Sequence, residues 1–259
     1  NLTGADLENA TLIGAKLITD GSSTVKLNSA NLTNAKMEKA DLTGANLTSA
    51  DLVGADLTGA DLTGTTLAST VFSETADGVV TAATLTSAIL TGANLNGRDL
   101  TGVDFEKATL SGANLTGADL ENATLIGAKL IADGNTAVKL MGATLTGAKL
   151  EKADLTGADL GKNGDVLTNL VGADLTGAIL KNADLGDALF TGANLEKADL
   201  TNTTLTNTVF SATADGVVTA ANLTSAILTS ADLNGRDLTG VDLEKADLSG
   251  ANLTGADLE

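Results

Sequence analysis

The sequence contains no cysteine, histidine, tryptophan, tyrosine or proline among its 259 residues. These absences exclude disulfides, cysteine-based zinc sites, histidine-based catalysis and linkers defined by proline. The remaining nucleophiles and bases are Ser, Thr, Lys and carboxylates, which recur at regular spacing and form no converging cluster. We therefore expect no enzyme activity, no cofactor and no metal site.

Basic residues are also scarce, because 15 Lys and Arg stand against 33 Asp and Glu, for a formal net charge of −18. Direct nucleic-acid binding needs Lys and Arg clusters that release counterions from phosphates, so nucleic acid is not an expected partner. No apolar run approaches the ~18 residues of a membrane span, and no signal peptide opens the chain. Localisation stays open between the cytoplasm and an exported cell-surface fibre, since a cysteine-free chain suits either.

What the sequence does contain is a leucine at almost every fifth residue from Leu2 to Leu258, with an alanine two places before it. Leucines five apart would be rotated by about 500° on a helix, so they form no helical stripe. In an extended segment, residues two apart face the same side. The Gly, Ser, Thr, Asn or Lys that follows lets the chain turn a corner. The pattern predicts a chain that coils around a packed axis of leucine and alanine.

The segments ADLTG at 40–44 and ANLTG at 113–117 match the motif A(D/N)LXX. With this motif over nearly its whole length, the chain resembles the pentapeptide repeat family. The resemblance implies an all-β fold, a right-handed quadrilateral parallel β-helix with four repeats to a coil. With ~20 residues per coil, we expect one continuous solenoid of about 13 coils over residues 1–259.

The octapeptide NLTGADLE occurs at 1–8, 114–121 and 252–259. We therefore expect an internal duplication, 1–113 and 114–251, with a third copy beginning at 252–259. Neither terminus shows the polar cap that solenoids usually need. The sequence favours a fragment of a longer array, or ends that stack on each other and propagate into a fibre.

The five-residue frame slips twice, between Phe72 and Leu85 and between Phe210 and Leu223. If each slip is three repeats shortened by two residues, the slips lie seven whole coils apart. Both loops are then expected on the same side of the rod, either as a repeated docking feature or as tolerated surface loops.

Three shorter breaks lie at 18–24, 131–137 and 161–166. The first two contain Asp-Gly pairs, which suggest tight turns. The third places Asp165 where a leucine belongs and follows a different local pattern. We expect these loops to be exposed.

The only arginines, Arg98 and Arg236, occupy the inward position that is normally alanine. A buried guanidinium without a partner is prohibitive. Asp77 and Asp215 lie about twenty residues earlier, one coil away on the twenty-residue count. We expect the structural ion pairs Arg98–Asp77 and Arg236–Asp215.

The residue before each leucine points outward, so stacking at twenty-residue intervals predicts columns along the rod. On that count, acid gathers on two adjacent faces, and a third column is more basic and apolar. The candidate interaction surface comprises Asp99, Asp119, Asp154, Asp159, Asp174 and Asp199, together with the apolar Ile89 and Leu189.

Two functional hypotheses remain. The first is a non-catalytic structural or scaffolding rod that associates end to end, or with the rest of a longer chain. The second is an acidic binding module that engages a basic protein surface. For this second hypothesis the resemblance supplies a precedent, because some pentapeptide repeat proteins mimic DNA and bind DNA gyrase.

Overall fold

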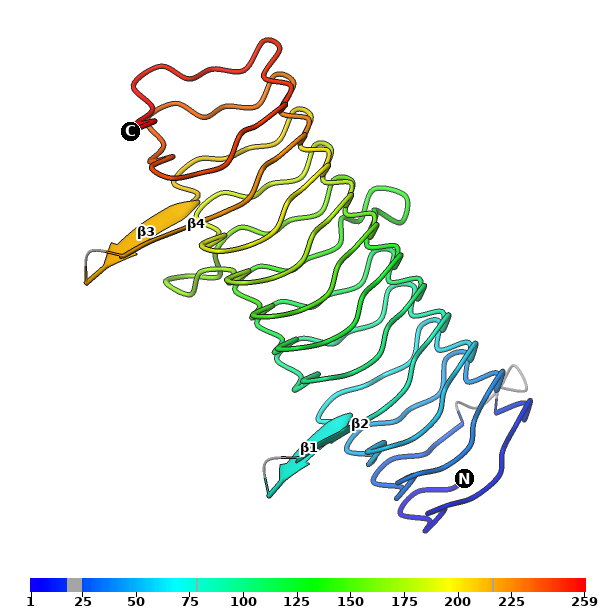
Figure 1. Cartoon of the computed structure of the whole chain (residues 1–259). Coiled ribbons are helices and arrows are strands. Elements are labelled where there is room, and N and C mark those ends of the chain that lie inside the picture. Colours follow the sequence, from blue (N-terminus) through cyan, green and yellow to red (C-terminus); the bar gives the residue numbers. More distant parts are fainter. Residues whose placement is uncertain (18–24, 78, 216) are drawn as a thin grey trace.

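The computed structural model describes residues 1–17, 25–77, 79–215 and 217–259, and shows a rod of stacked coils with the termini at opposite ends (Figure 1). Four named strands form two antiparallel hairpins: β1 (Ser73–Ala76) with β2 (Val79–Ala82), and β3 (Ser211–Ala214) with β4 (Val217–Ala220). Within the described ranges there is no helix, and so none long and apolar enough to cross a membrane.

The coils are joined by parallel bridges one residue wide, which stack the outward residues into four columns. Two columns are unbroken. The Thr11 column contains Thr11, Lys36, Asp56, Thr84, Asp104, Thr124, Lys149, Asp174, Asn194, Asn222 and Asp242. The Lys16 column contains Lys16, Asp41, Asp61, Ile89, Thr109, Lys129, Asp154, Ile179, Asp199, Ile227 and Asp247. Each of these ladders takes one residue from every coil that it crosses.

The other two columns each consist of three bridged runs, interrupted at the coils that carry the hairpins. The Asp6 column contains Asp6, Asn31, Asp51, Val71, Asp99, Asp119, Thr144, Asn169, Leu189, Val209, Asp237 and Asp257. The Lys26 column contains Lys26, Asn46, Thr66, Asn94, Asn114, Lys139, Asp159, Asp184, Thr204, Asp232 and Asn252.

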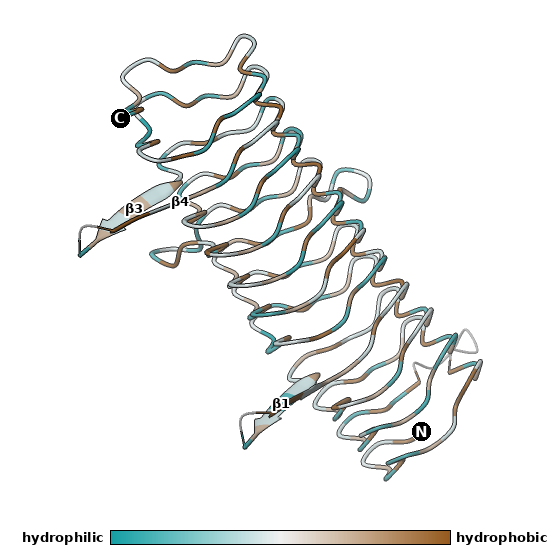
Figure 2. Cartoon of the chain, in the orientation of Figure 1, coloured by the Kyte–Doolittle hydropathy of each residue, from teal (hydrophilic) through white to brown (hydrophobic). Residues whose placement is uncertain are grey.

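Leucine and alanine fill the axis of the rod, as the repeat pattern predicts. From Leu27 to Leu233, the leucines at the repeat centres have 0% exposure, and the alanines two places before them are almost as fully buried. Each fully buried leucine contributes ~1.5–3 kcal/mol. Phe190 and Phe210, in neighbouring coils, stack with ring centroids 5.7 Å apart. Figure 2 shows the hydrophobic residues recurring at corresponding positions in successive coils.

The corners explain why Asp and Asn are so common before the leucine. In the corner after Leu32, Ala35 N donates to Leu32 O at 3.0 Å, and Asn34 has a φ of 54°. This left-handed conformation favours Gly and Asn. In the next coil, Asp51 Oδ1 accepts a hydrogen bond from Val53 N at 3.0 Å. The outward carboxylate or amide therefore satisfies a corner N–H that no strand reaches.

The two frame slips are the hairpins, and the predicted count of repeats across them is wrong. Ala83 N donates to Phe72 O at 2.7 Å and closes the first hairpin. Asp56 bridges Thr84, a step of 28 residues where an ordinary coil takes 20. Each slip is thus one repeat with eight extra residues. From Val71 to Val209 the Asp6 column makes six steps and not seven, so both hairpins still leave from the same corner, as Figure 1 shows.

The loops at 131–137 and 161–167 also add residues within one repeat. Asn114 bridges Lys139 and Thr144 bridges Asn169, steps of 25 residues. Each loop contains a small antiparallel turn, Asp133↔Thr136 and Asn163↔Val166, so the two loops share a structure although their sequences follow different patterns. Both loops are exposed, as predicted. The loop expected at 18–24 lies outside the described residues.

These insertions lower the number of coils. The Thr11 column has eleven members, and residues after it begin one further coil. The expectation of about 13 coils is therefore too high, because it assigned ~20 residues to coils that contain 25 or 28.

Candidate functional site

The predicted interaction surface does not exist as one surface. Its members are distributed over all four columns: Asp99, Asp119 and Leu189 in the Asp6 column, Asp174 in the Thr11 column, Ile89, Asp154 and Asp199 in the Lys16 column, and Asp159 in the Lys26 column. The error has a single cause. An inserted loop that is counted as a repeat moves every later residue onto the neighbouring face.

In the observed columns, one face carries carboxylates and no cation over the part of the chain that the structure describes. We define the Asp6 face as the Asp6 column, the corner residues that follow it, and the two hairpins that leave from that corner. In its described residues this face has no lysine or arginine. Its twelve carboxylates are those of Asp6, Glu8, Asp51, Glu74, Asp77, Asp99, Asp119, Glu121, Asp215, Asp237, Asp257 and Glu259.

We define the neighbouring Thr11 face as the Thr11 column and the corner residues that follow it. On this face, lysines stand beside the acidic residues. Its corners carry adjacent Glu-Lys pairs. Lys107 Nζ lies 2.5 Å from Glu106 Oε1, Lys245 Nζ lies 2.7 Å from Glu244 Oε1, and Lys197 pairs with Glu196. Acid on the Thr11 face is thus largely balanced within the face, whereas acid on the Asp6 face is not.

Each hairpin packs between two coils of the Asp6 face. A Cβ on Gly102, in the next coil, would lie 3.0 Å from Val80 Cγ1. In the second hairpin, a Cβ on Gly240 would lie 2.9 Å from Val218 Cγ1. Ser73 Oγ donates to Asp99 Oδ1 at 3.1 Å. The glycine corners therefore hold the base of each hairpin close to the coil that follows.

The hairpins also expose aliphatic side chains. Val79 and Val80 are 65% and 43% exposed, and Val217 and Val218 are 65% and 44% exposed. Four exposed valines on two projecting hairpins are more than the isolated aliphatics of an ordinary surface. The sequence analysis placed both loops on the same side of the rod but did not connect them with the acidic face, because the predicted columns were displaced.

The predicted arginine pairs are absent from the ion pairs of the described residues, all of which involve lysine. Arg98 is half-buried, and its Nε donates to Asn96 O at 3.2 Å. Arg236 Nε donates to Asn234 O at 3.1 Å. Asp77 follows the four-residue strand β1, which extends ~13 Å from the coil at ~3.3 Å per residue. The guanidinium therefore turns outward to the carbonyl of its own corner.

Hydrogen bonds hold several outward carboxylates in the ionised form. The hydroxyl and the backbone N–H of Thr239 keep the pKa of Asp237 below its ordinary value, and Ser249 does the same for Asp247. Partial burial acts to raise the pKa of Asp199, but hydrogen bonds from Thr201 and Lys181 outweigh it, and the pKa is lowered. These aspartates are charged acceptors at neutral pH.

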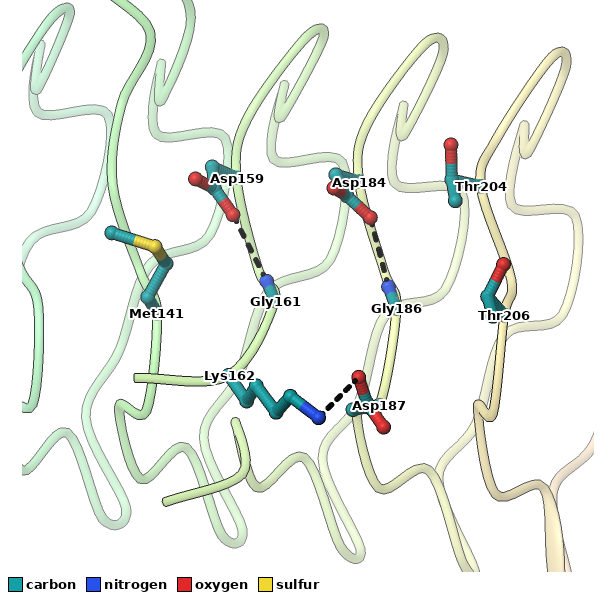
Figure 3. Close-up of a pocket in the computed structure, with 9 residues that line it drawn as sticks. All are labelled: Met141, Asp159, Gly161, Lys162, Asp184, Gly186, Asp187, Thr204 and Thr206. Carbon is teal, nitrogen blue, oxygen red and sulfur yellow. Dashed lines mark hydrogen bonds and ion pairs between the residues drawn. The ribbon is translucent and has the colours of Figure 1, made fainter. Parts of the chain in front are cut away.

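A shallow hollow lies along the Lys26 column and the corner residues that follow it, between Met141 and Thr206 (Figure 3). It forms because Gly161 and Gly186 stand in consecutive coils at a corner position where other coils carry a side chain. Asp159 and Asp184, which also line the hollow, each accept a hydrogen bond from one of these glycine N–H groups, at 3.1 and 3.0 Å.

The hollow offers no evident chemistry. Lys162 Nζ lies 3.4 Å from Asp187 Oδ2, so its one cation is paired within the hollow. Over the described ranges, no group of three or more His, Cys, Asp or Glu side chains is arranged to hold a metal ion.

A family model described as pentapeptide repeats matches the chain in eight copies, over residues 26–74, 81–117, 99–131, 139–161, 168–207 and 219–255. A search of curated proteins gave no match.

Several solved structures are similar. HetL, a pentapeptide repeat protein involved in heterocyst differentiation regulation from the cyanobacterium Nostoc sp. strain PCC 7120, is 32% identical over 92% of this chain and 90% of its own, with a TM-score of 0.45. A trypsin-treated form of QnrB1, a plasmid-mediated fluoroquinolone resistance protein, is 18% identical over 94% and 91%, with a TM-score of 0.36. Rfr23 from the cyanobacterium Cyanothece 51142 is 26% identical over 58% and 91%, with a TM-score of 0.17.

Proposed function

Since the chain belongs to the pentapeptide repeat family, we propose that it is a non-catalytic structural or scaffolding rod that presents its faces to other proteins. The observation that carries this proposal is that the inward and outward residues of each repeat have separate roles. Leucine and alanine point into one continuous core, while the outward Asp and Asn mostly bond their own corners. The remaining outward groups are free to vary along the rod without disturbing the fold.

The proposal includes association through the ends of the rod. Leu2, Leu7, Leu248 and Leu253 are only partly buried, and Leu258 is 59% exposed, whereas leucines in the interior coils are 0% exposed. Exposed coil ends attract either further repeats of a longer chain or the end of another molecule, which extends the array into a fibre. The right-handed sense of the coil and the duplication 1–113 and 114–251 are part of the same proposal.

Electron microscopy with negative stain, together with light scattering, tests the end-to-end association. We expect filaments or lengthened rods for the unmodified chain, and single rods for the double variant Leu253→Asp and Leu258→Asp. The control variant Thr43→Asp and Thr206→Asp adds the same two charges to exposed side positions and should still assemble. Single rods from the unmodified chain over a wide concentration range would contradict the end-to-end association.

The Asp6 face supports a second candidate, an acidic binding module for a basic protein surface. Its twelve carboxylates without a cation match such a partner by charge. DNA gyrase is the precedent that the family resemblance offers. Inhibition of gyrase supercoiling by the purified chain, lost when the Asp6 face is neutralised, is the expected result for this candidate. Unchanged supercoiling at rod concentrations well above that of gyrase would exclude gyrase as the partner.

A further inference from the structure

We propose that the Asp6 face contains two equivalent docking sites for basic protein segments in which Lys or Arg is flanked by aliphatic residues. Each site combines a hairpin with the pair of carboxylates that follows it along the rod. The first consists of Val80, Asp99 and Asp119, and the second of Val218, Asp237 and Asp257. This proposal rests on the scaffolding function proposed above, and it identifies the part of the rod that binds a partner protein.

The carboxylate pairs lie beside the hairpins. Asp99 bridges Asp119 in the next coil, and Asp237 bridges Asp257. Neighbouring strands are ~4.8 Å apart, so each pair presents two negative charges within reach of one or two cations. Glu121, at the corner after Asp119, adds a third carboxylate to the first site.

The exposed valine of each hairpin faces the same region of the surface. Val80 packs against the corner at Gly102, three residues after Asp99, and Ser73 of the same hairpin donates to Asp99. Val218 packs in the same way against Gly240, three residues after Asp237. Each site therefore places an aliphatic surface next to uncompensated charge, which fits a segment that is both apolar and basic.

The second site also contains an unsatisfied donor. Ser211 corresponds to Ser73 and is equally buried, at 5% exposure. Its Oγ has no hydrogen-bond partner among the described residues, whereas Ser73 Oγ bonds Asp99. A buried polar group without a partner costs free energy, so the second site differs from the first in leaving this hydroxyl unsatisfied.

Charge decides between a basic protein and a second copy of this chain. Two Asp6 faces brought together would oppose twelve carboxylates with twelve more, and like charges at strand spacing repel. A basic partner gains from the same carboxylates. Two cations stand next to the sites in the chain, Arg98 and Arg236, and the Nε of each bonds a carbonyl of the preceding corner.

The spacing of the sites favours a partner that binds at two points. Six steps of the Asp6 column separate the hairpins, which corresponds to ~29 Å at ~4.8 Å per step. When one of two linked segments binds, it holds the other at a high effective concentration near the second site. The linked pair therefore binds more tightly than either segment alone.

Binding of synthetic peptides to the full-length chain tests the proposal. The monovalent probe is the peptide Lys-Val-Lys-Val-Lys with blocked ends, and the bivalent probe joins two such peptides by a flexible Gly-Ser linker of about 25 residues, whose root-mean-square span is ~29 Å. By calorimetry or fluorescence anisotropy, we expect the bivalent probe to bind about 100-fold more tightly than the monovalent one.

The variant that removes both sites replaces Asp99, Asp119, Asp237 and Asp257 by Asn, which keeps the oxygen that bonds each corner N–H. The matched control replaces Asp41, Asp61, Asp154 and Asp247 of the Lys16 column by Asn and removes the same charge from another face. We expect at least about 10-fold weaker binding for the first variant and little change for the control.

A third variant tests the two-site geometry. Val80→Thr with Asp99→Asn and Asp119→Asn alters the first site alone, and should lower the affinity of the bivalent probe to the monovalent level. An equal loss in the Lys16-column control would show that binding follows net charge, and would overturn the proposal. So would rods that pair side by side more strongly as salt is added, because the partner would then be a second copy. End-to-end assembly is measured without peptide, so failure of the scaffold proposal is distinguishable.

Discussion

The Asp6 face and the Thr11 face share one core but differ in how their charges are balanced. Leu120 belongs to the first face and Leu125 to the second, and both are fully buried. Outside the core, the Thr11 face pairs Glu106 with Lys107, whereas the Asp6 face bridges Asp99 with Asp119. Since the fold tolerates either solution, the uncompensated charge of the Asp6 face is not a requirement of folding. The difference points to function on the outside of the rod.

The largest effect should come from the core, where the two faces are expected to behave alike. Leu120→Asp and Leu125→Asp each remove a buried leucine, worth ~2–5 kcal/mol, and add the cost of burying a carboxylate. Thermal unfolding followed by circular dichroism should show a large and similar fall in midpoint for both variants. A variant that kept the midpoint of the unmodified chain would show that its leucine does not point inward.

Substitution of a corner glycine should destabilise the two faces to different extents. Gly102→Ala and Gly127→Ala both place alanine at positive φ, 68° and 63°. The new Cβ would lie 3.0 Å from Val80 Cγ1 at Gly102, but 3.7 Å from Lys107 Cγ at Gly127. We expect Gly102→Ala to lose about 1 kcal/mol more in urea unfolding, because overpacking adds to the backbone strain. Equal losses would mean that the hairpin does not pack on that corner.

Charge removal should have a smaller effect, of opposite sign on the two faces. Asp119→Asn relieves repulsion with Asp99 and should raise stability by about 0.5 kcal/mol at low salt. Glu106→Gln removes the partner of Lys107 and should lower stability. Urea unfolding at low salt and at ~1 M NaCl, where the screening length is ~3 Å, measures both effects. Differences that persist at high salt would not be electrostatic.

The smallest effect is the dependence of stability on pH. The Asp6 face should lose stability at low pH, and the Thr11 face at high pH. The pKa of Asp237 is lowered in the folded chain, so its contribution is present above the unfolded pKa and is lost as pH falls through the folded pKa. The hydrogen bond and charge of Glu106 raise the pKa of Lys107, so its contribution is present below the unfolded pKa and is lost as pH rises through the folded pKa.

Thermal midpoints measured across pH check this contrast. Asp237→Asn should reduce the loss of stability below about pH 4, and Lys107→Met should reduce the loss above about pH 10. If both variants altered the same end of the pH profile, the assignment of these groups would be incorrect.

The sequence predicts the core well because burial imposes strict periodicity. Leu and Ala must return to the axis every five residues, and the family match and the burial of these residues agree. The shared corner of the two hairpins was also correctly predicted, although the count was seven coils and the observed count is six. Any whole number of coils gives the same side.

The outer surface was not predictable by the same reasoning. A solvent-exposed loop has no period, so sequence spacing does not say whether it replaces repeats or is inserted within one. The hydrogen bond from Ala83 N to Phe72 O shows that the first loop is inserted within one repeat. This backbone contact has no signature in the residue pattern. Because the repeat count was wrong, the residues of the predicted acidic surface were assigned to the wrong columns. The same error led to the prediction that Asp77 lies next to Arg98.

The most direct test of this account uses the absence of cysteine from the natural sequence. Asp119→Cys with Thr144→Cys places two outward thiols on bridged residues, at the ~4.8 Å spacing of neighbouring strands, within the 4.4–6.8 Å Cα separation of disulfides. Asp119→Cys with Lys139→Cys follows the twenty-residue count instead and places the thiols in different columns. We predict a disulfide by mass spectrometry in the first variant under mild oxidation and free thiols in the second. The reverse result would show that the Asp6 column is assigned to the wrong residues, and the Asp6 face with it.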